Sequence, residues 1–122
     1  MASLGDHTYH IVSGVPEAEL ENEALGWLFT GYAFERYRKQ SGTRAGLVAP
    51  DGIDPKRTEI LAQAEVLTRD LINTPTSDMG PPELEAAART LAGSFDASIQ
   101  VTVGDDLLGE NFPMIHAVGR AS

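Results

Sequence analysis

The 122-residue sequence contains no cysteine, which excludes a disulfide framework and any thiol chemistry. It also lacks a phosphate-binding glycine loop, a His-Glu-x-x-His motif and a Gly-x-Ser-x-Gly motif, so the short signatures of nucleotide binding, zinc peptidases and serine hydrolases are missing. Three histidines are present, but they are not grouped at metal-ligand spacing. We therefore expect no catalytic, cofactor-binding or metal-binding residues in this sequence.

Basic residues and long apolar runs are also scarce. Only 9 Lys and Arg stand against 18 Asp and Glu, and this net charge of -9 disfavours attraction to nucleic acid or anionic lipid. No apolar run approaches the roughly 18 residues of a membrane span, and the start lacks the basic and apolar regions of a signal peptide. We expect a soluble, cytoplasmic protein with no nucleic-acid partner and no membrane partner.

A local exception to the acidic balance lies between Arg36 and Arg57. Six of the nine basic residues fall in this range, together with Asp51 and Asp54. A polyanion site is one interpretation of this pattern. The basic end of a helix followed by a solvated loop explains it more simply, and we adopt that interpretation.

The first half of the chain shows the strongest apolar pattern. A β-prone run at 8–12 lies between glycines and is typical of a short edge strand. Residues 16–40 place apolar side chains at helical spacing on two stripes, with glutamates near the start and basic residues near the end. We predict one long helix over 16–40 that buries two faces, then a short strand at 47–49.

Residues 54–82 predict a helix, a hinge and the start of a second helix. Asp54 suits a helix cap, and apolar residues then recur every three or four positions up to Asn73. Asparagine tolerates the left-handed conformation that ends many helices, and Pro75 disfavours helix at Thr74. The face expected to be buried on this 54–73 helix consists of Ile60, Leu61, Ala64, Leu67, Thr68, Leu71 and Ile72.

The last third of the chain predicts a helix over 82–93, a strand over 98–103 and a helical turn at 107–108. Residues 112–118 suit either a helix capped by Asn111 or a strand, and we favour the helix. The expected fold class is α/β, dominated by helix and incomplete. Its expected order is strand, helix, strand, helix, helix, strand, helix, and a final helix or strand.

Two polar groups invite a metal-binding interpretation. His7 and His10 lie close in sequence, and Asp105, Asp106 and Glu110 form the densest acidic trio. Neither group has the spacing of a known metal motif. We interpret the histidines as exposed residues near a terminus and the carboxylates as charges at a helix start.

Aromatic side chains at helical spacing suggest a ligand cage, but packing explains that spacing better. Arg69 and Asp70 lie at the hinge, where we assign them structural roles. The aromatic residues in question are Trp27, Phe29, Tyr32, Phe34 and Tyr37.

Longer stretches of the sequence resemble a known family. The run TRDLINTPTSDMGPPELEAAARTLA, followed by IHAVGRAS, resembles the region that opens the catalytic domain of the leucyl aminopeptidase (cytosol aminopeptidase) family of two-metal peptidases. The run WLFTGYAFERYR resembles an upstream helix of the same family. The resemblance implies that 1–53 ends an amino-terminal domain, that 54–73 is a connecting helix and that 74–122 begins a catalytic domain.

The resemblance also implies a function for a parent protein, which would remove amino-terminal residues from peptides with two divalent metal ions, zinc or manganese. In that family the metal ligands lie downstream of the Val-Gly-Arg-Ala-Ser run, so we expect these 122 residues alone to be inactive. The expected partners are the remainder of an aminopeptidase chain, subunits of a homo-oligomer and the parent's peptide substrate. The alternative is a stand-alone acidic interaction module that binds a protein through the aromatic helix at 16–40.

Overall fold

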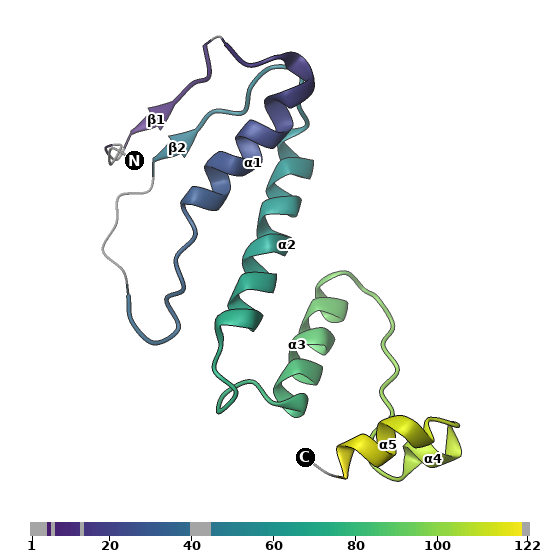
Figure 1. Cartoon of the computed structure of the whole chain (residues 1–122). Helices are drawn as coiled ribbons and strands as arrows, with labels where there is room; N and C mark the ends of the chain where they lie inside the picture. The colour runs from purple at the N-terminus through teal and green to yellow at the C-terminus, as the bar shows by residue number, and fades with distance from the viewer. Residues whose placement is uncertain (1–4, 6, 13, 40–44, 121–122) are drawn as a thin grey trace. The chain divides into compact units, whose positions relative to one another are not determined.

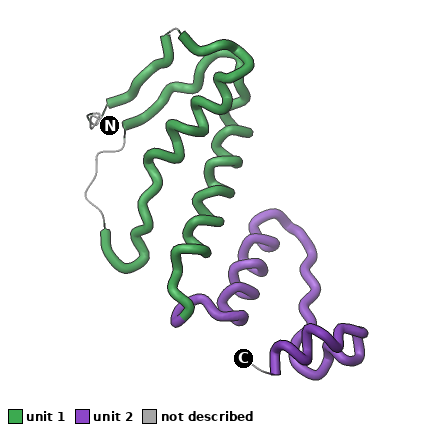
Figure 2. The backbone as a smooth tube through the Cα atoms, in the orientation of Figure 1, with its two compact units in different colours: residues 1–76 green, residues 77–122 purple. Residues whose placement is uncertain are grey.

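The computed structural model describes residues 5, 7–12, 14–39 and 45–120. Its elements are β1 (Thr8–Tyr9), the 3₁₀ helix η1 (Glu17–Glu19), α1 (Leu20–Thr30), β2 (Gly46–Leu47), α2 (Pro55–Asn73), α3 (Pro81–Ser94), α4 (Asp106–Gly109) and α5 (Pro113–Gly119) (Figure 1). The chain separates into two compact units, residues 1–76 and 77–122 (Figure 2). The expected excess of helix is confirmed, and the three-part division at 53 and 73 stays a prediction.

The two short strands pair with each other in parallel, with Thr8 opposite Gly46 and Tyr9 opposite Leu47. Both are shorter than the runs predicted at 8–12 and 47–49, and β2 begins one residue earlier. Trp27 of α1 contacts β1 and the residue before β2: its ring centroid lies 5.6 Å from that of Tyr9, and its Nε1 donates a hydrogen bond of 3.2 Å to the carbonyl of Ala45. The strands therefore pack on α1 through one aromatic side chain.

The long helix predicted over 16–40 is wrong at both ends. Residues 17–19 form the 3₁₀ helix η1, and α1 ends at Thr30, ten residues before the predicted end. The last turn tightens because the amide of Gly31 donates to the carbonyl of Leu28 at 3.2 Å. Tyr32 then leaves the helix axis, and its hydroxyl bonds to α2.

The interface between α1 and α2 is made of small side chains. Ala24 of α1 and Thr58 and Ala62 of α2 are buried, and no large side chain is fully buried among the described residues. The prediction that the apolar face of α2 is buried is wrong for most of its members: Ile60 is 47% exposed and Ile72 is 76% exposed. The face carrying Thr58 and Ala62 packs on α1 instead, because small residues let two helices approach closely.

The hinge after α2 has the predicted position and one of the two predicted causes. The helix ends at Asn73 as expected, and Asp54 caps its start by accepting from the amides of Lys56 and Arg57 at 3.0 and 3.2 Å. Asn73, however, is not left-handed. The other predicted cause is the one observed: Thr74 is extended, with ψ of 122°, as a residue before proline prefers.

The second unit starts with α3, which has nearly the predicted boundaries. Its first turn is closed by Glu83, whose carboxylate accepts from the amide of Gly80 at 2.9 Å. The strand predicted over 98–103 is wrong, since those residues have no regular structure and no strand beside them in the described chain. A strand without a neighbour leaves its backbone groups unpaired, which explains the difference.

Helix, rather than strand, is confirmed over Pro113–Gly119, and the helical turn near 107 is confirmed as α4. The predicted cap at Asn111 is wrong: Asn111 is left-handed, with φ of 63°, and Phe112 occupies the cap position. No helix among the described residues is long and apolar enough to cross a membrane.

Candidate functional site

A polar cluster connects Tyr32, two residues beyond the end of α1, to the last turns of α2. The hydroxyl of Tyr32 donates to Asp70 Oδ1 at 2.8 Å and accepts from Asn73 Nδ2 at 3.0 Å. These partners lie 38 and 41 residues away in sequence. Together with Arg69 they form what we call the Tyr32 cluster.

Arg69 packs on the rings of Phe29 and Tyr32. Its guanidinium carbon lies 5.3 Å from the ring centroid of Phe29 and 5.4 Å from that of Tyr32, distances typical of cation–π contacts. Its Nε also donates to Glu65 Oε1 at 2.8 Å, one helical turn earlier. The charge of Arg69 is thus balanced, and its position holds both rings against α2.

The environment of Tyr32 raises the pKa of its hydroxyl above the ordinary 10.0. Desolvation is the largest cause, and the hydrogen bond to Asp70 and the negative charge of that carboxylate act in the same direction. The hydrogen bond from Asn73 and the charge of Arg69 lower the pKa and offset part of this effect. Tyr32 is therefore protonated at neutral pH, as its hydrogen bond to Asp70 requires.

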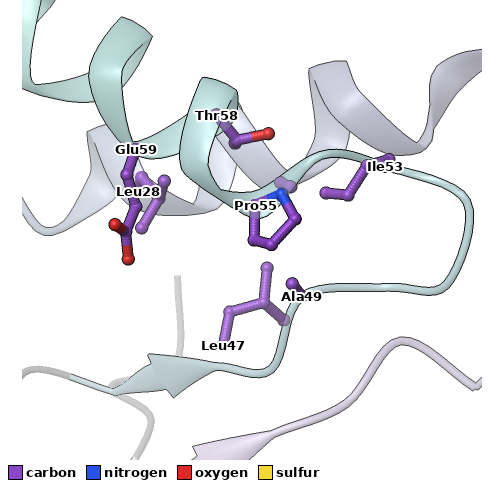
Figure 3. A pocket seen from close by; sticks show the side chains of 8 residues that line it. Leu28, Leu47, Ala49, Ile53, Pro55, Thr58 and Glu59 are labelled. Carbon is purple, nitrogen blue, oxygen red and sulfur yellow. The ribbon is translucent and has the colours of Figure 1, made fainter.

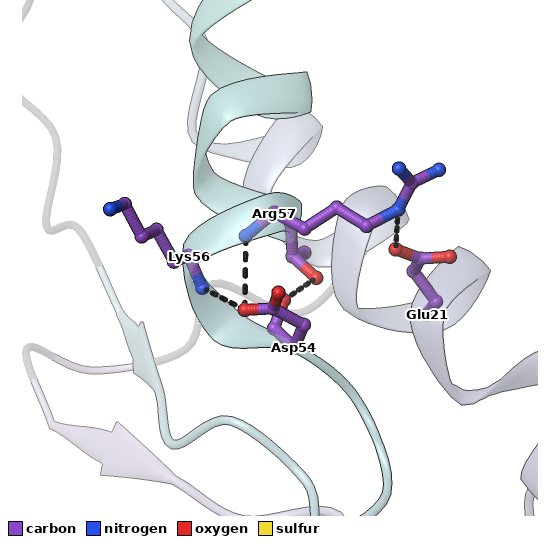
Figure 4. Close-up of polar contacts among 5 residues, drawn as sticks. Glu21, Asp54, Lys56 and Arg57 are labelled. Atoms are coloured by element: carbon purple, nitrogen blue, oxygen red, sulfur yellow. Dashed lines mark hydrogen bonds and ion pairs between the residues drawn. The ribbon is translucent and has the colours of Figure 1, made fainter.

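The opposite end of α2 is fixed by a second set of polar contacts (Figure 4). Beside the cap at Asp54, Arg57 Nε donates to Glu21 Oε1 at 3.1 Å and so connects α2 to α1. This ion pair is exposed, which limits its contribution to stability to well under about 1 kcal/mol. It serves as an orienting contact between the two helices.

A small pocket of about 70 Å³ lies where α1, β2 and the start of α2 meet (Figure 3). Glu59 is the one titratable residue in its lining, and the hydroxyl of Thr58 already donates to the carbonyl of Asp54 at 3.0 Å. The lining offers no pair of groups for acid–base or nucleophilic chemistry. Its residues are Ala24, Leu28, Leu47, Ala49, Ile53, Pro55, Thr58 and Glu59.

The acidic trio considered from the sequence lies along the short helix α4, with Asp105 and Glu110 at its two cap positions. Asp105 lies 3.0 Å from Nε2 of His116, and Asp106 begins α4. His7 and His10 are both exposed. In the described part of the chain, no group of three or more His, Cys, Asp or Glu side chains is placed to hold a metal ion. That the protein has no catalytic or metal-binding residues here stays a prediction.

The aromatic residues do not form one cage but make three separate contacts. Trp27 packs on Tyr9, Phe34 packs on Tyr37 with ring centroids 5.8 Å apart, and Arg69 covers the other two rings. Packing is thus the observed role, although Tyr32, Phe34 and Tyr37 lie beyond the end of α1 and not at helical spacing. Sequence reasoning missed the pairing of Tyr32 with Asp70 and Asn73, because no local pattern signals a contact across this separation.

Comparison with known proteins gives a consistent relationship. No family model matches the chain. Peptidase B of Yersinia pseudotuberculosis and Peptidase B of Yersinia pestis are each 35% identical to it over 115 residues, which is 89% of this chain and 26% of the relative. The crystal structure of cytosol aminopeptidase from Coxiella burnetii shares its fold with a TM-score of 0.74 and 32% identity, over 82% of this chain and 22% of that one.

These likenesses relate the chain to one part of Peptidase B and of a cytosol aminopeptidase. The resemblance to the leucyl aminopeptidase family, predicted from the Arg-Asp-Leu-Ile-Asn-Thr-Pro run and its surroundings, is confirmed. The chain spans about a quarter of the length of the curated relatives that it matches.

Proposed function

We propose that these residues are the segment of a leucyl aminopeptidase-like protein that connects an amino-terminal domain to the first elements of a catalytic domain. One observation carries the proposal: nearly the whole chain aligns, at 35% identity, with a single quarter of Peptidase B. The segment then has a mechanical role. Its 19-residue helix α2 is the connector, held against α1 at its start by Arg57 and at its end by the Tyr32 cluster.

The parent reaction in this proposal is removal of an amino-terminal residue from a peptide in the cytosol. Two divalent ions, zinc or manganese, would activate a water molecule and polarise the scissile carbonyl in the complete protein. The described residues do not fit such a pair of ions, since they contain no group of carboxylates and histidines placed to hold one. In this proposal the segment positions parts of the complete protein and supplies no metal ligand for the reaction.

The first test uses the purified 122-residue chain. We expect no hydrolysis of leucyl amide with added zinc, manganese or magnesium, because the segment supplies no metal ligands. Turnover by a clean preparation that a chelator abolishes would contradict the inactive-segment proposal. Contaminating peptidases are controlled by a mock purification from cells without the gene.

A chimera tests the connecting role directly. Peptidase B of Yersinia pestis in which this chain replaces the matched 115 residues should fold and hydrolyse leucyl amide. The matched control is the same chimera with Ala62→Pro, which breaks α2 in its interior and should lose activity. A first chimera that is folded by circular dichroism, binds metal and is inactive would contradict the proposal.

The alternative, a stand-alone module binding through the aromatic helix, has less support. Trp27, Phe29 and Tyr32 are all engaged inside the first unit, so they are not presented together to a partner. The transcript beyond codon 122 discriminates between the two functions. A Lys- and Asp-rich metal motif within about one domain length supports the segment, whereas an immediate stop codon supports the module.

A further inference from the structure

We propose that the Tyr32 hydroxyl is a latch that holds the last turn of α2 in place. The hydroxyl uses its donor and its acceptor at once, toward Asp70 at 2.8 Å and from Asn73 at 3.0 Å. Both partners lie in the final turn of α2, and Tyr32 lies outside that helix. The inference is independent of the peptidase assignment.

Asp70 links the latch to the backbone of the hinge. Its carboxylate accepts from Tyr32, while its carbonyl accepts from both the amide and the hydroxyl of Thr74, at 3.1 and 2.7 Å. Thr74 is only 7% exposed and has the extended backbone that ends the helix. A shift of Asp70 would therefore disturb the side-chain contact and the helix end together. The hydroxyl that fixes Asp70 thus also fixes the start of the hinge.

The ring of Tyr32 is held separately from its hydroxyl, which makes the latch testable. Arg69 lies over the ring, and phenylalanine would keep that contact and the volume of the side chain. Tyr32→Phe therefore removes the two hydrogen bonds and little else. It leaves the carboxylate of Asp70 without its partner, which costs more than the loss of an average hydrogen bond.

Amide hydrogen exchange provides the first test on the whole chain. In Tyr32→Phe, the amides of residues 71–74 should exchange roughly tenfold faster, the factor that about 1.4 kcal/mol represents. The amides of Gly46 and Val48 in the strand pair should keep their rates, which shows that the first unit remains folded. The matched control is Tyr9→Phe, whose hydroxyl makes only a 3.5 Å contact with Gly5, and it should leave residues 71–74 unchanged.

The latch would be overturned if a folded Tyr32→Phe variant showed exchange rates at residues 71–74 within twofold of the wild-type rates. If that variant does not fold, Asn73→Ala provides the same test, because it removes one of the two hydrogen bonds and leaves Asp70 paired. Asn73→Ala should raise the same exchange rates by about threefold. Unchanged rates in this variant would also overturn the latch.

A spectroscopic readout separates the latch from simple packing. The charged groups that act on the hydroxyl are Asp70 and Arg69 of α2. In a Tyr9→Phe, Tyr37→Phe background, tyrosinate absorbance reports Tyr32 alone. Asp70→Asn should shift its ionisation to lower pH, because the negative charge beside it is gone. An unshifted titration would show that the Tyr32–Asp70 hydrogen bond does not form in solution.

Discussion

Two buried threonines mark the start and the end of α2. Thr58 and Thr74 are 3% and 7% exposed, and each hydroxyl donates to the carbonyl four residues earlier, at Asp54 and Asp70. A buried hydroxyl with a partner costs little, whereas one without a partner costs about 1–3 kcal/mol. The two threonines lie in the first turn of α2 and just beyond its last residue. At each end of α2, a buried threonine hydroxyl therefore donates to a backbone carbonyl four residues earlier and helps to fix that end of the helix.

The cap at Asp54 should contribute measurably to stability. Asp54→Ala removes the acceptor for the amides of Lys56 and Arg57 and should lower the free energy of unfolding by about 1 kcal/mol. Urea unfolding followed by circular dichroism measures this change. Asp51→Ala, in the exposed turn before the helix, is the matched control with the same change in charge. Equal losses in the two variants would show that charge, and not capping, is responsible.

At the scale of the elements, local signals predicted α2 and α3 well. Asp54-Pro55, Pro75, Gly80-Pro81 and Glu83 act within a few residues of the boundaries that they define. The end of α1 could not be predicted in this way, because it depends on Tyr32 bonding to residues that follow some forty positions later. The strand predicted over residues 98–103 does not form for a related reason, because a β-prone segment becomes a strand only when a partner strand lies beside it.

The candidate site was predictable only in part, because its contacts join residues that are far apart in the sequence. Arg69 and Asp70 were assigned structural roles from their place at the hinge, and their contacts agree with that role. Their partners Phe29 and Tyr32 were interpreted as ordinary core residues. The packing face of α2 was also misassigned, because periodicity identifies an apolar stripe but does not determine which face meets a neighbour.

The hinge itself can be tested with one substitution. Pro75→Ala removes the steric restriction on Thr74, so α2 should extend beyond Asn73 and the amides of residues 75–77 should gain exchange protection. Pro82→Ala, in the first turn of α3, is the control and should leave α2 unchanged. Unaltered protection after Pro75→Ala would mean that the hydrogen bonds of Thr74, and not proline, end the helix.

At the scale of the whole molecule, apolar side chains are left uncovered. Among the described residues of the second unit none is buried, and Phe95, Met114 and Val118 are each at least two-thirds exposed. The apolar stripe of α2 in the first unit is similarly open at Ile60 and Ile72. These exposed side chains agree with the proposal that the chain is a segment of a larger protein.

The emission of Trp27 tests whether the first unit keeps its own packing. Because the indole is partly buried against Tyr9 and bonded to Ala45, we expect a blue-shifted emission that persists when the chain is diluted. Sedimentation over the same concentrations, with Trp27→Phe as the blank for fluorescence, reports self-association through the exposed apolar faces. A red shift on dilution would show that another copy covers Trp27. A water-exposed emission at all concentrations would contradict the packing of α1 described above.

The small residues between α1 and α2 have a thermodynamic consequence. Ala24, Thr58 and Ala62 bring the two helices close while removing little apolar surface from water. The heat capacity increment of unfolding depends on the apolar surface that unfolding exposes. For the first unit this increment will be small for its length, so its stability curve will be broad and shallow. Modest warming or cooling will therefore change the population of α2 only gradually.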